Sequence, residues 1–251
     1  MRWLPLESNP DVLNAYTRAL GLSIEHTFAD IYGLDDDLLE MIPQPVHAIY
    51  VLFPHEKTDF DESTLSKDDS IYFVDQDPAI GNACGTIAIM NSFGNIGDKI
   101  RFKPNSFFPR FYEQTRSMSS AERGKAVMGE QELEQAHLGA AHEGQSECPP
   151  EDAHVDYHFI AFIEKKGRLI ELDGIKPRPV DHGPCSPENL LKGTANVVKK
   201  MIEESNDKMG FSLIALTNTD PDDLKELIEK EKAKMEEDEK EEKKEEEKKK
   251  D

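Results

Sequence analysis

The sequence contains few cysteines: Cys84, Cys148 and Cys185 are the three among 251 residues. An odd number of widely spaced cysteines excludes a framework of disulfide bonds, and free thiols persist in a reducing compartment. The first ten residues lack the apolar segment of a secretory signal peptide. The longest apolar run, around residues 48–53, is far too short to cross a bilayer. We therefore expect a soluble, cytoplasmic protein.

Basic residues are also scarce relative to acidic ones. The chain has 30 Lys and Arg against 51 Asp and Glu, and its formal net charge is -21. Residues 220–251 contain 16 acidic residues and 10 lysines, which leaves a net charge of -15 on residues 1–219. Nucleic acids and anionic membranes attract Lys and Arg, so this charge argues against both as partners. It favours a basic partner, attracted by the long-range field.

The length suits one large domain or two small ones. From residue 220 onward the chain is almost entirely Glu and Lys, so we expect a folded domain over 1–219 and a tail over 220–251, disordered or a lone helix. Cysteine and histidine show no paired spacing for zinc, and no glycine loop suits a phosphate. Periodicity and turn residues predict helices over 10–21, 82–92, 118–129 and 187–204, strands over 46–54, 70–74, 158–164, 168–173 and 211–217, and loops over 56–69 and 140–156.

Cys84 has the surroundings of a reactive thiol. It lies in the apolar stretch AIGNACGTIAIMNS, which covers residues 79–92. A helix that begins near Asn82 places Cys84 in its first turn, where the helix dipole favours a thiolate. Gly85 allows another group to approach closely. A single free cysteine is usually only a small hydrophobic residue, however, so a nucleophile needs a base nearby.

The stretch HFIAFIEKKGRLIELDG, residues 158–174, supplies a candidate base and its partner. If Lys165 and Lys166 form the hairpin turn, His158 lies directly opposite Asp173. The Cβ atoms of such a pair are roughly 4.5–5.5 Å apart on one face of the sheet. A register shift of one residue would separate them. The pair could also serve only to close the hairpin. The other histidines have no acidic partner at strand spacing, and His182 is expected in a turn.

Four separated motifs together resemble one family. They are RWLPLESNPDVLN at 2–14, NACGT at 82–86, AHEGQ at 141–145 and the predicted hairpin ending in LIELDG. In this order they are similar to the ubiquitin C-terminal hydrolases, papain-like cysteine proteases that remove adducts from the C-terminus of ubiquitin. The resemblance covers about residues 2–217 and leaves the acidic tail outside.

The resemblance implies a fold, a site and a partner. The fold is α/β, of the α+β type, with a central antiparallel sheet wrapped by helices and a knotted backbone. The site has Cys84 as nucleophile, His158 as general base and Asp173 as orienting carboxylate. Residues 144–153 match the crossover loop through which the substrate's tail threads. No cofactor is implied, and the expected partner of a monomeric enzyme is ubiquitin or a close ubiquitin-like protein.

Three acidic residues match family positions that contact the basic face of ubiquitin: Glu7, Asp11 and Asp30. Exposed carboxylates also occur simply as solvated surface residues. The resemblance therefore predicts a binding role for these three, and a plain surface role is the alternative.

One position departs from the family. Its members have a glutamine six residues before the nucleophile, where this chain has Pro78, which offers neither a side-chain donor nor a backbone N–H. Gln76 lies two residues further upstream. Either the segment 77–81 bulges and returns the Gln76 amide to the oxyanion hole, or the site lacks this donor. The resemblance thus implies a thiol-dependent ubiquitinyl hydrolase, with a ubiquitin-binding protein of weak or no turnover as the alternative. A redox-sensing thiol protein is a third possibility.

Overall fold

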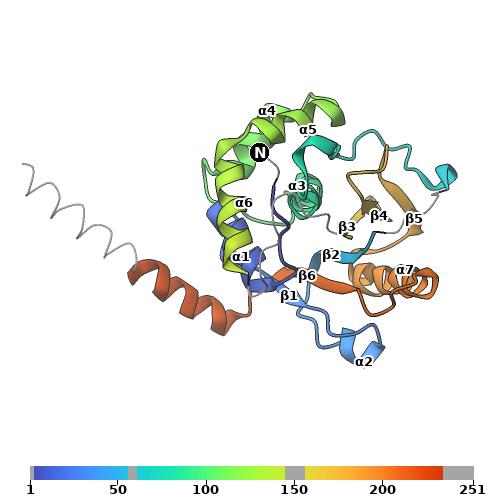
Figure 1. The fold of residues 1–251 in the computed structure, drawn as a ribbon. Helices are drawn as coiled ribbons and strands as arrows, with labels where there is room; N and C mark the ends of the chain where they lie inside the picture. Colours follow the sequence, from blue (N-terminus) through green and yellow to red (C-terminus); the bar gives the residue numbers. More distant parts are fainter. Residues whose placement is uncertain (1–2, 56–60, 145–155, 234–251) are drawn as a thin grey trace, which may run out of the picture. The chain divides into compact units, whose positions relative to one another are not determined.

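The computed structural model describes residues 3–55, 61–144 and 156–233 (Figure 1). The chain divides into two units, Met1–Asn218 and Thr219–Asp251. The α-helices of the first unit are α1 (Pro10–Ala19), α2 (Asp36–Leu39), α3 (Cys84–Ile96), α4 (Phe107–Thr115), α5 (Ser120–Gly129), α6 (Gln131–Glu143) and α7 (Leu190–Glu204). Its strands are β1 (His26–Asp30), β2 (Val46–Pro54), β3 (Tyr157–Lys165), β4 (Arg168–Leu172), β5 (Val180–Pro184) and β6 (Ser212–Asn218). Short 3₁₀ turns are η1 (Glu62–Thr64), η2 (Pro78–Ile80) and η3 (Pro187–Asn189).

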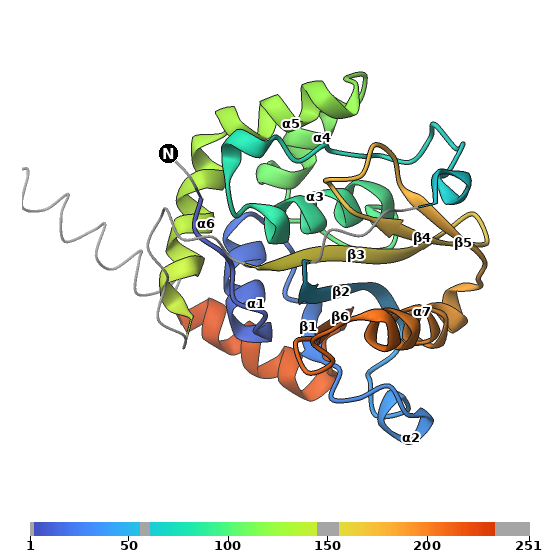
Figure 2. The ribbon, with the colours of Figure 1, turned by 45° about the vertical axis from the view of Figure 1, so that its right-hand side comes forward.

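Within the described residues, the strands form one antiparallel sheet in the order β1-β6-β2-β3-β4-β5. Helix α3 packs on β3, and α7 packs on β2 and β3 (Figures 1 and 2). Successive residues of β2 enter different hydrophobic clusters: Tyr50 joins the cluster around α3, and Ile49 and Val51 join the one around α7. Strand side chains alternate between faces, so a continuous apolar run marks a strand buried on both sides. The expected antiparallel sheet wrapped by helices is confirmed; the knot stays a prediction.

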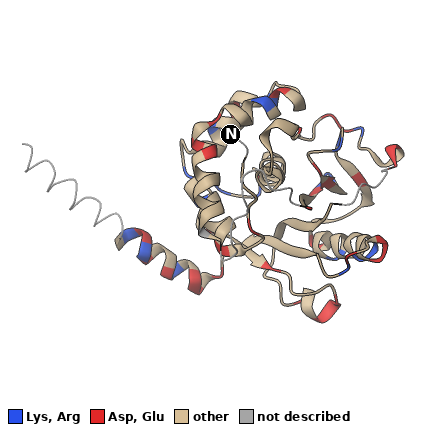
Figure 3. Ribbon diagram, viewed as in Figure 1, with Lys and Arg blue, Asp and Glu red and all other residues tan. Residues whose placement is uncertain are grey.

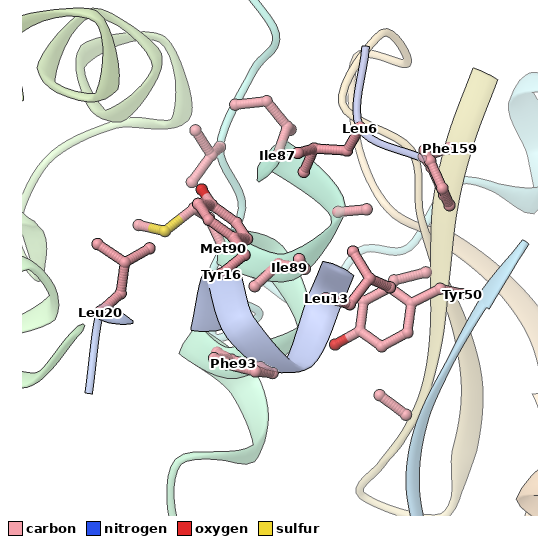
Figure 4. Close-up of a cluster of buried hydrophobic side chains, with 14 of the residues drawn as sticks. Leu6, Leu13, Tyr16, Leu20, Tyr50, Ile87, Ile89, Met90, Phe93 and Phe159 are labelled. Atoms are coloured by element: carbon pink, nitrogen blue, oxygen red, sulfur yellow. The ribbon is translucent and has the colours of Figure 1, made fainter. Parts of the chain in front are cut away.

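Helix α3 forms the centre of the larger cluster because nearly all of its side chains are apolar or small and buried. Figure 4 shows α3 side chains packed against residues of α1 and of the sheet. The members that it labels are Leu6, Leu13, Tyr16, Leu20, Tyr50, Ile87, Ile89, Met90, Phe93 and Phe159. A helix that is apolar on every side must be enclosed. Burial of α3 therefore fixes the position of its first residue, Cys84.

The predicted strand over residues 70–74 is wrong. This segment begins with a turn, has no regular secondary structure and pairs with no strand among the described residues. The side chain of Asn91 accepts a hydrogen bond from Val74 N (2.6 Å) and donates to Val74 O (3.3 Å). Asn95 does the same for Tyr72, at 2.9 and 2.7 Å. Side-chain amides of α3 thus satisfy backbone groups that a neighbouring strand would otherwise satisfy.

The predicted hairpin is confirmed, but its register is wrong by two residues. Lys165 pairs with Arg168, and Ala161 pairs with Leu172. The turn is formed by Lys166 (φ 51°) and Gly167 (φ 78°). Two consecutive left-handed residues are typical of the tight type I′ hairpin turn, in which glycine is favoured. A shift of two residues keeps every side chain on its face, so the expected partners still share one side of the sheet.

Two further expectations need correction. Residues 180–184, expected to be a turn, form the edge strand β5, which pairs with β4. The expected loop over 140–156 begins later, because α6 continues to Glu143; residues 145–155 lie outside the described part. Helix α5 begins with a capping box, in which Ser119 and Glu122 are bonded reciprocally.

The second unit contains a helix over residues 221–233. Its side chains are mostly exposed, and Lys and Glu alternate along it (Figure 3). Lys225 pairs with Asp222 at 2.7 Å within this helix. No helix in the described ranges of either unit has the length and hydrophobicity needed to span a membrane.

Candidate active site

Helix α3 begins at Cys84, two residues later than expected, so Cys84 lies in the first turn as the sequence predicts, and it is half-buried. The preceding turn is held by the N-terminal segment, where Asn82 N donates to Trp3 O at 3.2 Å. A Cβ atom on Gly85 would lie 3.3 Å from both Leu6 and Phe159. The glycine therefore lets the first turn of α3 pack closely between the N-terminal segment and β3, which fixes the thiol beside the sheet.

His158 and Asp173 meet although they are not paired in the ladder. His158 lies opposite Phe53 of β2, and Asp173 follows the last residue of β4. Their side chains nevertheless approach to 2.7 Å, from Nε2 to Oδ1. Ile175 N donates to the same Oδ1 at 3.2 Å. Both side chains are less than a tenth exposed. Because Nε2 bonds to the carboxylate, Nδ1 is the ring nitrogen available to the thiol.

The pKa of His158 depends on both Asp173 and Cys84. Burial alone would lower the pKa of His158, but side-chain hydrogen bonds to Asp173 and to Cys84 raise it to about 9. The imidazole is therefore protonated at neutral pH. A positive charge hydrogen-bonded to a cysteine favours its thiolate form. The arrangement can hold a thiolate–imidazolium pair, oriented by a buried carboxylate.

Gln76 lies beside the array of Cys84, His158 and Asp173. The segment after it forms the short turn η2, capped by the Asp77 side chain, which accepts from Ala79 N. Gln76 N donates to Gly174 O at 2.8 Å, next to Asp173, and its side-chain Nε2 donates to Gly81 O at 3.3 Å. An amide nitrogen carries two protons, so one N–H remains for another acceptor. The 3₁₀ turn η2 lies between Gln76 and Cys84, so this segment does not run fully extended, as the expected bulge requires.

The three acidic residues expected to bind a partner line one cavity of about 590 Å³. Glu7 and Asp11 approach it from the start of the chain, and Asp30 from the end of β1. Burial raises the pKa of Asp30, and the charge of Asp11 raises it further. The same cavity is lined by Tyr32 and Met41, which are 80% and 71% exposed.

Large apolar side chains exposed in this way often mark a binding surface. The sequence analysis missed Tyr32 and Met41, because isolated apolar residues near a short helix give no periodic signal. Acidic residues of α2 lie close to them in the chain (Figure 3). The face thus combines negative charge with exposed apolar area.

Comparison with known proteins places the chain. Residues 3–203 match the family described as ubiquitin carboxyl-terminal hydrolase, family 1. The chain belongs to this family. A probable ubiquitin carboxyl-terminal hydrolase of Dictyostelium discoideum is 42% identical over 224 residues, 85% of this chain and 87% of the relative. Ubiquitin carboxyl-terminal hydrolase 3 of Arabidopsis thaliana is 42% identical over 225 residues, 86% of this chain and 94% of the relative.

The fold agrees with this membership of the ubiquitin carboxyl-terminal hydrolase family. The UCH37 catalytic domain of Trichinella spiralis, solved bound to ubiquitin vinyl methyl ester, superposes with a TM-score of 0.70 at 20% identity. The match covers 88% of this chain and 97% of that chain. The expected resemblance and fold class are confirmed, and the chain is an enzyme of a hydrolase family.

In the described part of this hydrolase, Cys185 and three buried histidines lie outside the array. Cys185 is buried, its pKa is raised by burial and by Glu164, and Cys148 lies outside the described residues. His26, His47 and His137 are buried, with lowered pKa values. Among the described residues, no cluster of three or more His, Cys, Asp or Glu is suited to hold a metal.

Proposed function

We propose that the protein is a thiol-dependent ubiquitinyl hydrolase that releases small or unfolded adducts from the C-terminal glycine of ubiquitin. The Cys84 thiolate attacks the carbonyl carbon of that glycine, and the His158 imidazolium gives its proton to the leaving amine or thiol. The resulting thioester is attacked by water, from which His158 now takes a proton. Ubiquitin leaves with a free carboxylate and the thiol is restored. Asp173 keeps the imidazole oriented throughout.

The main support is the buried hydrogen-bond array. The Nε2–Oδ1 distance of 2.7 Å and the raised pKa of His158, about 9, fit a base that is charged in the resting enzyme. A resting ion pair supplies both the nucleophile and the acid for the leaving group. A His–Asp pair that only closed a hairpin would not need a cysteine as its second partner.

Ubiquitin binds, in this proposal, on the face formed by Glu7, Asp11 and Asp30. Negative charge next to exposed Tyr32 and Met41 suits a partner with basic residues around an apolar patch. The Trichinella spiralis enzymes of similar fold were solved with ubiquitin vinyl methyl ester bound. Residues 1–219 act as the catalytic domain, as a cytoplasmic monomer, and residues 220–251 are an appended tail.

The crossover loop limits the size of the leaving group. Residues 144–153 are assigned to it by resemblance, and all but Gly144 lie outside the described part. A continuous loop over the site must let the leaving group pass, so short or unfolded adducts leave faster than folded ones. Equal rates on a short peptide adduct and a folded ubiquitin dimer would contradict this limit.

A ubiquitin vinyl sulfone probe tests the proposal directly. We expect a covalent adduct at Cys84, located by peptide mass spectrometry, and hydrolysis of ubiquitin–fluorophore that Cys84→Ala abolishes while ubiquitin binding persists. Cys185→Ala is the matched control and should retain turnover. Binding without an adduct would favour a ubiquitin-binding protein of weak turnover, and hydrolysis by Cys84→Ala within tenfold of the wild type would exclude Cys84 from the chemistry.

A further inference from the structure

Asp173 faces a second group of charges on the side away from His158. Its Oδ2 atom lies 3.8 Å from Lys176 Nζ. The same ammonium contacts Oε1 of Glu171, a buried carboxylate of β4 with 4% exposure. The other oxygen of Glu171, Oε2, is 2.7 Å from His182 Nε2 in β5. Lys176 therefore bridges two buried carboxylates, of which one belongs to the proposed catalytic array.

The Glu171 carboxylate is ionised in this arrangement. Burial would raise the pKa of Glu171, but the hydrogen bond to His182 and the charge of Lys176 lower it below its ordinary value. A buried carboxylate without a partner is costly, so Glu171 holds the Lys176 ammonium firmly. The ammonium, held in this way, is a fixed positive charge beside the oxygen of Asp173 that His158 does not use.

We propose that Lys176 is a positioning residue for the array of Cys84, His158 and Asp173, held in place by Glu171. It orients the Asp173 carboxylate through Oδ2, and together with Glu171 it sets how much negative charge faces the imidazole. The predicted changes in activity rest on the proposed function. The predicted changes in the pKa of His158 do not depend on it.

The two charges predict opposite effects on the pH at which the ion pair is lost. Removing the Lys176 charge leaves more net negative charge near His158, which favours the imidazolium and raises the pKa of His158. Removing the Glu171 charge leaves Lys176 uncompensated, which lowers that pKa. The alkaline limb of activity should therefore move up in Lys176→Met and down in Glu171→Gln. A purely structural role has no reason to produce opposite signs.

Other titratable groups also face the array. The ring of His55, at the end of β2, is centred 5.3 Å from that of His158. Cys84 faces it from α3, and His182 reaches it only through Glu171. His55 and Cys84 keep their side chains in every variant, so each variant is compared with the wild type on the same background; His182 loses its carboxylate partner in Glu171→Gln.

Lys99 provides a matched control. It pairs with Glu164, another buried carboxylate, at 2.6 Å. It lies just beyond the C-terminal end of α3, roughly 20 Å along the helix from Cys84. Lys99→Met should therefore lower the unfolding temperature much as Lys176→Met does, while leaving the pH profile unchanged.

The experiment measures kcat/KM for ubiquitin–fluorophore against pH in the wild type, Lys176→Met, Lys176→Arg, Glu171→Gln and Lys99→Met. Lys176→Met should lose on the order of tenfold at its optimum, because small displacements of a catalytic group cost much rate. Lys176→Arg should recover most of that loss. Opposite shifts of the alkaline limb in Lys176→Met and Glu171→Gln support the proposal; unchanged limbs, or shifts in one direction, overturn it.

If Lys176→Met does not fold, Glu171→Gln alone decides. An alkaline limb shifted to lower pH supports the proposal, and an unshifted limb overturns it. The pKa of the His158 imidazole, followed by NMR of its ring against pH in the free enzyme, reports the same protonation without ubiquitin. A wild type that does not hydrolyse ubiquitin–fluorophore defeats the proposed function, and the His158 pKa values of the variants still decide the role of Lys176.

Discussion

The side-chain amide of Gln76 has two protons, and one of them is bonded to Gly81 O. We propose that the second proton donates to the oxyanion formed when Cys84 attacks its substrate, with Cys84 N as the other donor. Loss of one such donor typically costs on the order of 10²–10³ in kcat. Gln76→Ala should therefore lower kcat by about two orders of magnitude with little change in ubiquitin affinity.

Steady-state kinetics on ubiquitin–fluorophore and a binding titration with ubiquitin give the two readouts. Gln114→Ala is a suitable control, because Gln114 is an exposed residue of α4, outside the proposed site. Hydrolysis by Gln76→Ala at the wild-type rate would show that Gln76 is an ordinary residue of the turn. It would also strengthen the alternative, a ubiquitin-binding protein of weak or no turnover.

At the scale of elements, a buried histidine ties three segments to the start of α3. His137 of α6 is completely buried; its Nε2 donates to Leu4 O at 2.6 Å, and its Nδ1 is 2.8 Å from Thr86 Oγ1. Tyr16 of α1 bonds to the same hydroxyl at 2.8 Å. Burial lowers the pKa of His137 to about 4, so the imidazole is neutral at pH 7. Leu4 O can only accept, so Nε2 carries the single proton and Nδ1 accepts from Thr86.

This lowered pKa predicts a loss of stability in acid. The ordinary pKa of 6.5 applies to the unfolded chain, which takes up the proton first as the pH falls. The contribution of His137 to stability is therefore complete above pH 6.5 and is lost as the pH falls towards 4. At pH 5 the loss amounts to about 2 kcal/mol.

His137→Gln keeps one donor and one acceptor but does not titrate. Urea unfolding at pH 7 and pH 5 should show a decline in free energy of unfolding that is about 2 kcal/mol smaller in the variant than in the wild type. The buried His26, with a pKa also lowered to about 4, contributes part of the decline in free energy of unfolding in both proteins. Equal declines would show that His137 does not supply this proton linkage.

For the whole molecule, the acidic charge is divided between the two units. Residues 1–219 have a net charge of -15, so ubiquitin association should weaken as salt screens this field. Deletion of residues 220–251 should leave turnover and most of the salt dependence in place, because the catalytic groups and the acidic cavity belong to the first unit.

Association rates with ubiquitin, measured for the full chain and the truncated chain between low and physiological salt, test this expectation. A truncated chain that retains its circular dichroism but loses affinity would make the tail part of the binding site. The proposed boundary at residue 219 would then be wrong.

The sequence by itself determined features that depend on near neighbours. The first-turn position of Cys84 follows from the apolar helix that begins there, and the shared face of His158 and Asp173 follows from the two-residue alternation of a hairpin. The register differs from the predicted one because the left-handed conformations of Lys166 and Gly167 place the two-residue turn one position later, and the resulting shift of two residues preserves the face.

Only the tertiary structure decided which distant segments meet. The approach of Cys84 to His158 depends on how α3 packs on β3, and the gathering of Glu7, Asp11 and Asp30 around one cavity depends on the joining of α1 and β1. No sequence pattern predicts that Lys176 contacts two carboxylates. Periodicity and turn preferences act over a few residues, whereas these contacts are set by the burial of whole faces, which no local pattern specifies.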